Sequence, residues 1–185
     1  MRRPSFVPLA ALALFAACTE APTATLPVFD LSAEMGVVAN GGRNAATPLS
    51  GSEEVPARDT RARGTAVFHL GDDGASLTYK LIVANIENVV ASHIHIGPAG
   101  ANGPVGVFLY GNAPAGGGRI DGVLAEGSLT AGSFIGPLAG LTVADLVDAM
   151  QAGNAYVNVH TNDGVAPANT GPGDFPGGEV RGQIR

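Results

Sequence analysis

Polar and apolar residues alternate along the chain from residue 62 onward, as they do in a strand with one buried face. In the first run the apolar face consists of Ala66, Phe68 and Leu70. Gly-Asp-Asp-Gly follows at 71–74, and its Asp-Gly step supplies the left-handed backbone conformation that a tight turn needs. Alternation resumes over 76–85, where the apolar face consists of Leu77, Tyr79, Leu81 and Val83. This pattern predicts a β-hairpin.

Short apolar runs recur through the rest of the chain, separated by clusters of Gly, Pro and Asn. The further strands that we expect are 91–96, 105–110, 118–124, 155–161 and 179–184. Regular short strands with turns between them are typical of an antiparallel β-sandwich or barrel. The sequence therefore predicts an all-β fold.

One segment has a helical pattern instead. Thr142 precedes Val-Ala-Asp, which is an approximate capping box with Asp145 in place of the usual Glu. Gly153 would end the helix in a left-handed conformation. The apolar stripe of the helix would consist of Leu141, Leu146 and Met150. We expect this short helix to cover one open end or edge of the sheet.

The N-terminal residues resemble a secretion signal. Arg2 and Arg3 precede an uncharged apolar run over 6–17, which is shorter than the roughly 20 residues of a membrane-spanning helix. Cys18 directly follows Leu-Phe-Ala-Ala, which resembles a bacterial lipobox, where the cysteine becomes the acylated first residue of the mature protein. The acyl chains would attach the protein to a membrane. The alternative is an ordinary signal peptide followed by a thiol without a role.

These features divide the chain into a signal peptide (1–17), a lipid-attachment site with a flexible linker (18–44) and one β domain (45–185). The expected location is the cell envelope, lipid-anchored, or alternatively the periplasm or the medium. Without its signal the chain would keep eight basic and sixteen acidic residues, and no cluster of Lys or Arg, so a nucleic-acid partner is not expected. The single cysteine excludes an internal disulfide. Motifs of phosphate loops, dinucleotide sites and nucleophile elbows are absent from the sequence.

Two histidines form a His-x-His sequence within an expected strand. The side chains of His93 and His95 would share one face, about 6.6 Å apart along the strand. Asn158 and His160 repeat this spacing in the strand expected at 155–161. If the two strands are neighbours, His93, His95 and His160 would converge and bind zinc or copper.

The alternative role for these histidines is structural. Their rings would hydrogen-bond the loops at 97–103 or 162–177 and hold them against the sheet. Under the metal hypothesis, Asp163 or Asp174 would add an oxygen ligand. We expect the fourth histidine, His69, at the surface of the hairpin.

Further charged residues recur near the two ends of the domain. They are Glu54, Glu179 and Arg181. A carboxylate and a guanidinium on neighbouring strands form a strong bidentate pair, and we expect Glu54 and Arg181 to lie close and pair, since terminal strands often meet in sandwiches. We interpret this pair as structural. A catalytic carboxylate pair is the alternative, although no nucleophile or water-activating partner accompanies it.

Four segments together resemble the chordin-type (CHRD) domain over about residues 48–185. They are Pro-Leu-Ser-Gly-Ser-Glu-Glu-Val-Pro at 48–56, Ala-Ser-His-Ile-His-Ile-Gly at 91–97, Tyr-Val-Asn-Val-His-Thr at 156–161 and Gly-Glu-Val-Arg-Gly-Gln-Ile at 178–184. Two departures from the family pattern are Ala57, where a second Pro is common, and the long loop at 162–177. The resemblance implies an immunoglobulin-like β-sandwich or barrel in an extracellular protein. The family takes its name from a binder of secreted signalling ligands, and its role in bacterial proteins is largely undefined.

The His-Ile-His-Ile-Gly sequence at 93–97 also resembles part of copper/zinc superoxide dismutase. That enzyme needs further histidines and a disulfide, so dismutase activity is not expected here. The function that we expect is a non-catalytic module tethered at the cell envelope, which binds an envelope or extracellular macromolecule or serves in adhesion or surface structure. The alternative is a small envelope protein that binds zinc or copper.

Overall fold

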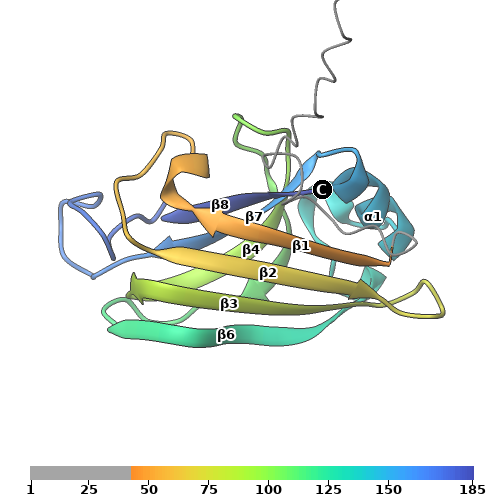
Figure 1. The fold of residues 1–185 in the computed structure, drawn as a ribbon, viewed down its shortest axis with the longest axis horizontal. Helices are drawn as coiled ribbons and strands as arrows, with labels where there is room; N and C mark the ends of the chain where they lie inside the picture. Colours follow the sequence, from red (N-terminus) through yellow and green to blue (C-terminus); the bar gives the residue numbers. More distant parts are fainter. Residues whose placement is uncertain (1–42) are drawn as a thin grey trace, which may run out of the picture. The chain divides into compact units, whose positions relative to one another are not determined.

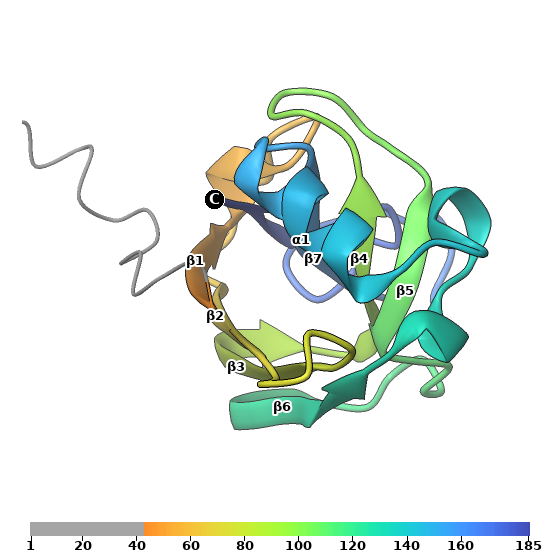
Figure 2. The ribbon, with the colours of Figure 1, turned by 90° about the vertical axis from the view of Figure 1, so that its right-hand side faces the viewer.

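The structure is a computed structural model that describes residues 43–185. A single antiparallel sheet of eight strands curls into a nearly closed barrel, in the order β5-β4-β7-β8-β1-β2-β3-β6 (Figures 1 and 2). The strands are β1 (Asn44–Ser50), β2 (Arg63–Leu70), β3 (Leu77–Glu87), β4 (Val89–Ile96), β5 (Val105–Tyr110), β6 (Arg119–Leu129), β7 (Ala155–Thr161) and β8 (Val180–Ile184). The helix is α1 (Val143–Gln151), and short 3-10 turns lie at Gly51–Glu53, Ala131–Ser133 and Gly136–Leu138. The expected all-β fold with one short helix is confirmed.

β2 and β3 form the predicted hairpin. Their register runs from the pair Arg63–Ala84 to the pair Leu70–Leu77. The turn closes where the Gly71 amide donates to the Ser76 carbonyl at 2.8 Å, and Gly74 has the left-handed conformation with φ of +66°. The residues of the two predicted apolar faces lie in or against the core: Ala66, Phe68, Leu70, Leu77, Tyr79, Leu81 and Val83.

Two strands differ from the sequence-based expectation. β1 is not among the strands that alternation predicts, because it contains two alanines, a threonine and a proline around one leucine, yet all seven of its residues pair with β2. β6 continues to Leu129, five residues beyond the expected end. In the part that the sequence does not predict, Ala-Glu-Gly-Ser at 125–128 shows no apolar alternation before the buried Leu129. The signal peptide, Cys18 and the linker up to residue 42 lie outside the described residues.

The helix α1 covers one end of the barrel, as Figure 2 shows by looking along the barrel. The predicted capping box is present: the Thr142 amide donates to Asp145 Oδ2 at 2.7 Å, and the Asp145 amide donates to Thr142 Oγ1 at 3.3 Å. Gly153 follows the helix with φ of +68°. Leu146 and Met150 are buried, but Leu141 is 40% exposed, so its place in the apolar stripe is wrong. Leu141 precedes the N-cap residue and is not helical.

Membrane-spanning helices are absent from the described part of the chain, where α1 is too short to cross a bilayer.

The strands β4, β7 and β8 are buried on both faces. Their inner face is apolar and contributes Ile94, Val157, Val159, Val180 and Ile184 to the barrel core. Their outer face is polar and carries His93, His95, Tyr156, Asn158, His160, Arg181 and Gln183. Loop residues cover this polar face, since its side chains hydrogen-bond to carbonyls of Gly97, Pro98, Ala101, Gly103 and Pro176. The outward-facing histidines therefore lie beneath loops.

Candidate metal centre

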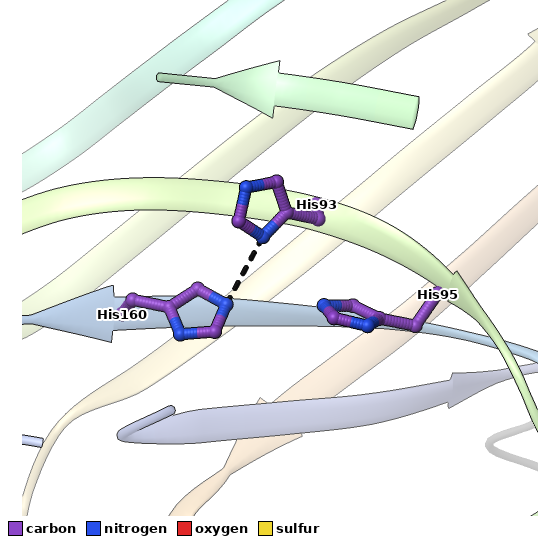
Figure 3. A group of neighbouring side chains, drawn as sticks. All are labelled: His93, His95 and His160. Carbon is purple, nitrogen blue, oxygen red and sulfur yellow. Dashed lines mark hydrogen bonds between the residues drawn. The ribbon is translucent and has the colours of Figure 1, made fainter. Parts of the chain in front are cut away.

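The three histidines come together on the outer face of two neighbouring strands. β4 and β7 pair antiparallel, with Ala91 opposite His160 and His93 opposite Asn158. One ring nitrogen from each of His93, His95 and His160 lies within 4.8 Å of the others (Figure 3). Sequence spacing predicts the shared face of His93 and His95, and the strand register adds His160. Three imidazole nitrogens on one side of an ion are a ligand set that zinc and copper both accept.

Two of the rings are anchored by backbone carbonyls in the loops above them. His95 Nδ1 lies 2.8 Å from the carbonyl oxygen of Gly103, and His160 Nδ1 lies 2.8 Å from that of Pro176. A carbonyl only accepts, so each Nδ1 carries the hydrogen and each Nε2 keeps a free lone pair. An Nδ1–H donated to a backbone carbonyl is the usual outer-shell contact of a metal-binding histidine. The same bonds hold the two loops, as the structural alternative expects.

His93 and His160 contact each other directly. His93 Nδ1 lies 3.0 Å from His160 Nε2, which is the dashed contact in Figure 3. Because His160 Nε2 has no hydrogen, His93 Nδ1 is the donor in the metal-free protein. Two nitrogens bound to one tetrahedral zinc at about 2.0–2.1 Å lie about 3.3–3.4 Å apart. An ion bound to both nitrogens would take the place of this hydrogen, whose proton would move to His93 Nε2, and would separate the two nitrogens by a few tenths of an ångström. The set of three nitrogens, which lie within 4.8 Å of one another, would draw closer around the ion.

His95 Nε2 is buried and has no hydrogen-bond partner among residues 43–185. A buried polar atom left in this state costs about 1–3 kcal/mol. The atom that lacks a partner is the one that faces the other two histidines as a ligand. The structural role of His95 is fulfilled by Nδ1 and does not explain this position of Nε2.

The electrostatic environment keeps the three imidazoles neutral at pH 7. Burial, followed by the neighbouring His160 and His95 rings, lowers the pKa of His93 from 6.5 to about 4. Burial is also the main cause that lowers the pKa of His95 and that of His160. The neutral imidazole is the form that binds a metal ion, so protons compete weakly at this site.

Aromatic rings fix the histidines from the sides. The ring of Tyr156 stacks on His95 with centroids 4.9 Å apart, and the rings of Phe108 and His93 form a T-shaped contact with centroids 4.5 Å apart. The guanidinium of Arg181 also lies over the Tyr156 ring, 3.4 Å from the ring centroid. The Tyr156 hydroxyl also accepts from the Gly103 amide at 3.0 Å. Tyr156 lies in the segment at 156–161 that resembles the CHRD domain. Nothing in the sequence around Phe108 indicates that it contacts the histidines.

The expected ion pair between Glu54 and Arg181 is wrong. Among the described residues, ion pairs with nitrogen–oxygen distances up to 4.0 Å do not include these two side chains. Arg181 donates to the carbonyls of Ala101 and Pro98 at 2.9 and 3.0 Å. Its charge is still close enough to lower the pKa of the Glu54 carboxyl against the dominant effect of burial.

The other candidate residues lie outside the histidine cluster. Glu179 accepts from the hydroxyls of Thr60 and Thr161 at 2.6 and 2.8 Å, which is a structural arrangement. Among residues 43–185, neither Asp163 nor Asp174 joins the group of potential metal ligands, so the expected oxygen ligand does not come from them. His69 is exposed on the hairpin, where its Nδ1 contacts Asn44 Oδ1.

Comparison with known proteins identifies one family. The model of the CHRD domain matches residues 45–184, which contain all eight strands except the first residue of β1. Neither the comparison with curated proteins nor that with solved structures gave a match. The family match covers the barrel and the three histidines, and the chain therefore belongs to the CHRD domain family.

Proposed function

We propose that this CHRD domain binds one zinc or copper ion through His93, His95 and His160. The observation that carries the proposal is the convergence of three ring nitrogens within 4.8 Å, two of them presented by rings whose Nδ1–H is held by a carbonyl. Imidazole nitrogens suit both metals, and divalent copper generally binds such sites more tightly than zinc. The ion would cross-link β4 to β7 beneath the two loops. Its role is non-catalytic.

Calorimetric titration with Zn²⁺ and with Cu²⁺ tests this proposal. The protein used is the full chain with Cys18→Ser, which removes the only thiol and with it an unrelated metal ligand. We expect one ion per chain, and loss of that binding in His95→Gln, because glutamine keeps a hydrogen bond to Gly103 but is a poor ligand. His69→Gln, at an exposed histidine outside the cluster, is the matched control. Absence of stoichiometric binding by the parent protein, or equal binding by His95→Gln, would refute the proposal.

We also propose that the domain works outside the cytoplasm, tethered to the cell envelope as a binding or structural module. The support is the leader sequence with its basic start and apolar run, and the placement of Cys18 directly after it. Cys18→Ser in the native host should move the protein from the membrane fraction to the soluble envelope or the medium. Unchanged fractionation and unchanged mass would contradict the lipid anchor.

A further inference from the structure

Asn158 lies at the centre of the polar face that carries the histidines. It is two residues from His160 on β7, opposite His93 on β4 and opposite Arg181 on β8. It is 3% exposed, and its Oδ1 has no hydrogen-bond partner among the described residues. Buried amide oxygens are nearly always paired, so this unpaired oxygen calls for an explanation.

Two atoms of this polar face, Asn158 Oδ1 and His95 Nε2, are buried and lack a hydrogen-bond partner among residues 43–185. The Asn158 side chain lies near enough to the His95 ring to act on its pKa, which burial lowers overall. Since His95 Nδ1 donates to the Gly103 carbonyl, His95 Nε2 carries a lone pair. Both atoms are therefore acceptors without a donor. A cation held between them would satisfy both.

The Glu54 carboxyl lies near the same amide, and its Oε1 also lacks a hydrogen-bond partner among the described residues. Burial raises the pKa of Glu54, and the Asn158 side chain acts in the opposite direction. Gly178, with φ of +123°, makes this approach possible, because a Cβ at that position would collide with the carboxyl of Glu54. An amide whose NH₂ group faces this carboxyl would present Oδ1 to the histidines.

We propose that Asn158 Oδ1 is the fourth ligand of the metal centre. The inference rests on the proposed three-histidine site and extends it to a shell of three nitrogens and one neutral oxygen. Four such ligands suit the tetrahedral preference of zinc. An oxygen ligand also favours divalent ions over Cu⁺, which prefers soft ligands.

Zinc titration of Asn158→Ala in the Cys18→Ser full chain tests the ligand role. We expect one ion per chain with affinity lowered at least about tenfold, since loss of an outer-shell partner alone costs about 10–100-fold. Asn158→Asp keeps an oxygen at this position and should bind zinc at least as tightly as Asn158→Ala binds it. Asn44→Ala removes the exposed asparagine that contacts His69 and is the matched control.

The outcomes separate the two proposals. Failure of the parent protein to bind zinc overturns the metal centre as a whole. If the zinc affinity of Asn158→Ala is within about threefold of that of the parent and its melting temperature is lower, only the ligand role is overturned. That result indicates a reversed amide, whose NH₂ group donates to His95. Where Asn158→Ala does not fold, the side-chain amide NMR signal of Asn158 in the parent protein decides: it should shift on addition of one equivalent of zinc, and an unmoved signal overturns the inference.

Discussion

Replacement of Glu54 by glutamine should change how the stability of the domain depends on pH. Glu54 is 5% exposed, and burial raises the pKa of its carboxyl from 4.5 to about 7, while the charges of Arg181 and Arg58 act in the opposite direction. Between these two values the folded protein keeps a proton that the unfolded chain releases. Stability therefore falls as pH rises through this range. A pKa difference of about 2.5 corresponds to ~3 kcal/mol.

His93 has the opposite effect on the pH dependence of stability, over nearly the same pH range. Its pKa falls from 6.5 in the unfolded chain to about 4 in the fold, mainly through burial. Between these values the unfolded chain binds the proton and the folded protein does not, so this contribution to stability is complete above pH 6.5 and is lost as pH falls toward 4. Its size is again ~3 kcal/mol. In the parent protein the two contributions therefore largely cancel between pH 4.5 and 7.

The assay is urea-induced unfolding of the full chain with Cys18→Ser at pH 4.5 and pH 8, with a chelator to exclude metal. Glu54→Gln removes the contribution that opposes His93. The free energy of unfolding of this variant should rise from pH 4.5 to pH 8 by ~3 kcal/mol more than that of the parent. Glu53→Gln, at an exposed carboxylate of the same turn, is the matched control. If Glu54→Gln and the parent respond to pH alike, Glu54 does not hold a proton in the folded state.

Two further predictions concern packing. Val159→Asp places a charge on the fully buried inner face of β7 and should prevent folding, so a normal melting temperature by circular dichroism would refute the face assignment. Gly178→Ala should destabilise the domain more than Gly118→Ala, as measured by urea unfolding. Both positions have positive φ, so the backbone strain is common to the two variants. Only the Cβ at 178 would collide with Glu54, while the Cβ at 118 meets no described atom within 4 Å. Equal losses would show that the approach of Glu54 to the Gly178 backbone is not tight.

Local patterns account for most of the fold. The hairpin, the strand at 155–161 and the capped helix follow from alternation, turn residues and the Thr142 capping box, and all three are confirmed. β1 and the end of β6 are not predictable in this way. Most of their residues are small or polar, and these segments become strands by pairing with β2 and β3.

The site was predictable only in part, for a related reason. The spacing of His93 and His95 fixes their common face, but the register that brings His160 to them is a tertiary property. The failed pairing of Glu54 with Arg181 shows the same limit. Carbonyls of the loop at 97–102 take up the guanidinium, and nothing in the sequence indicates that this loop folds over β8.

The two faces of β4 and β7 are coupled through this register. Ile94 pairs with Val157 in the barrel core, and this pairing sets His93 opposite Asn158 on the outer face. A shift of either strand by one residue would exchange its two faces, placing histidines in the core and valines under the loops. The apolar pairs of the core therefore determine where the candidate ligands lie. Substitutions of the ligands, by contrast, leave the side chains of the inner face unchanged, so the metal hypothesis can be tested without altering the apolar pairs of the core.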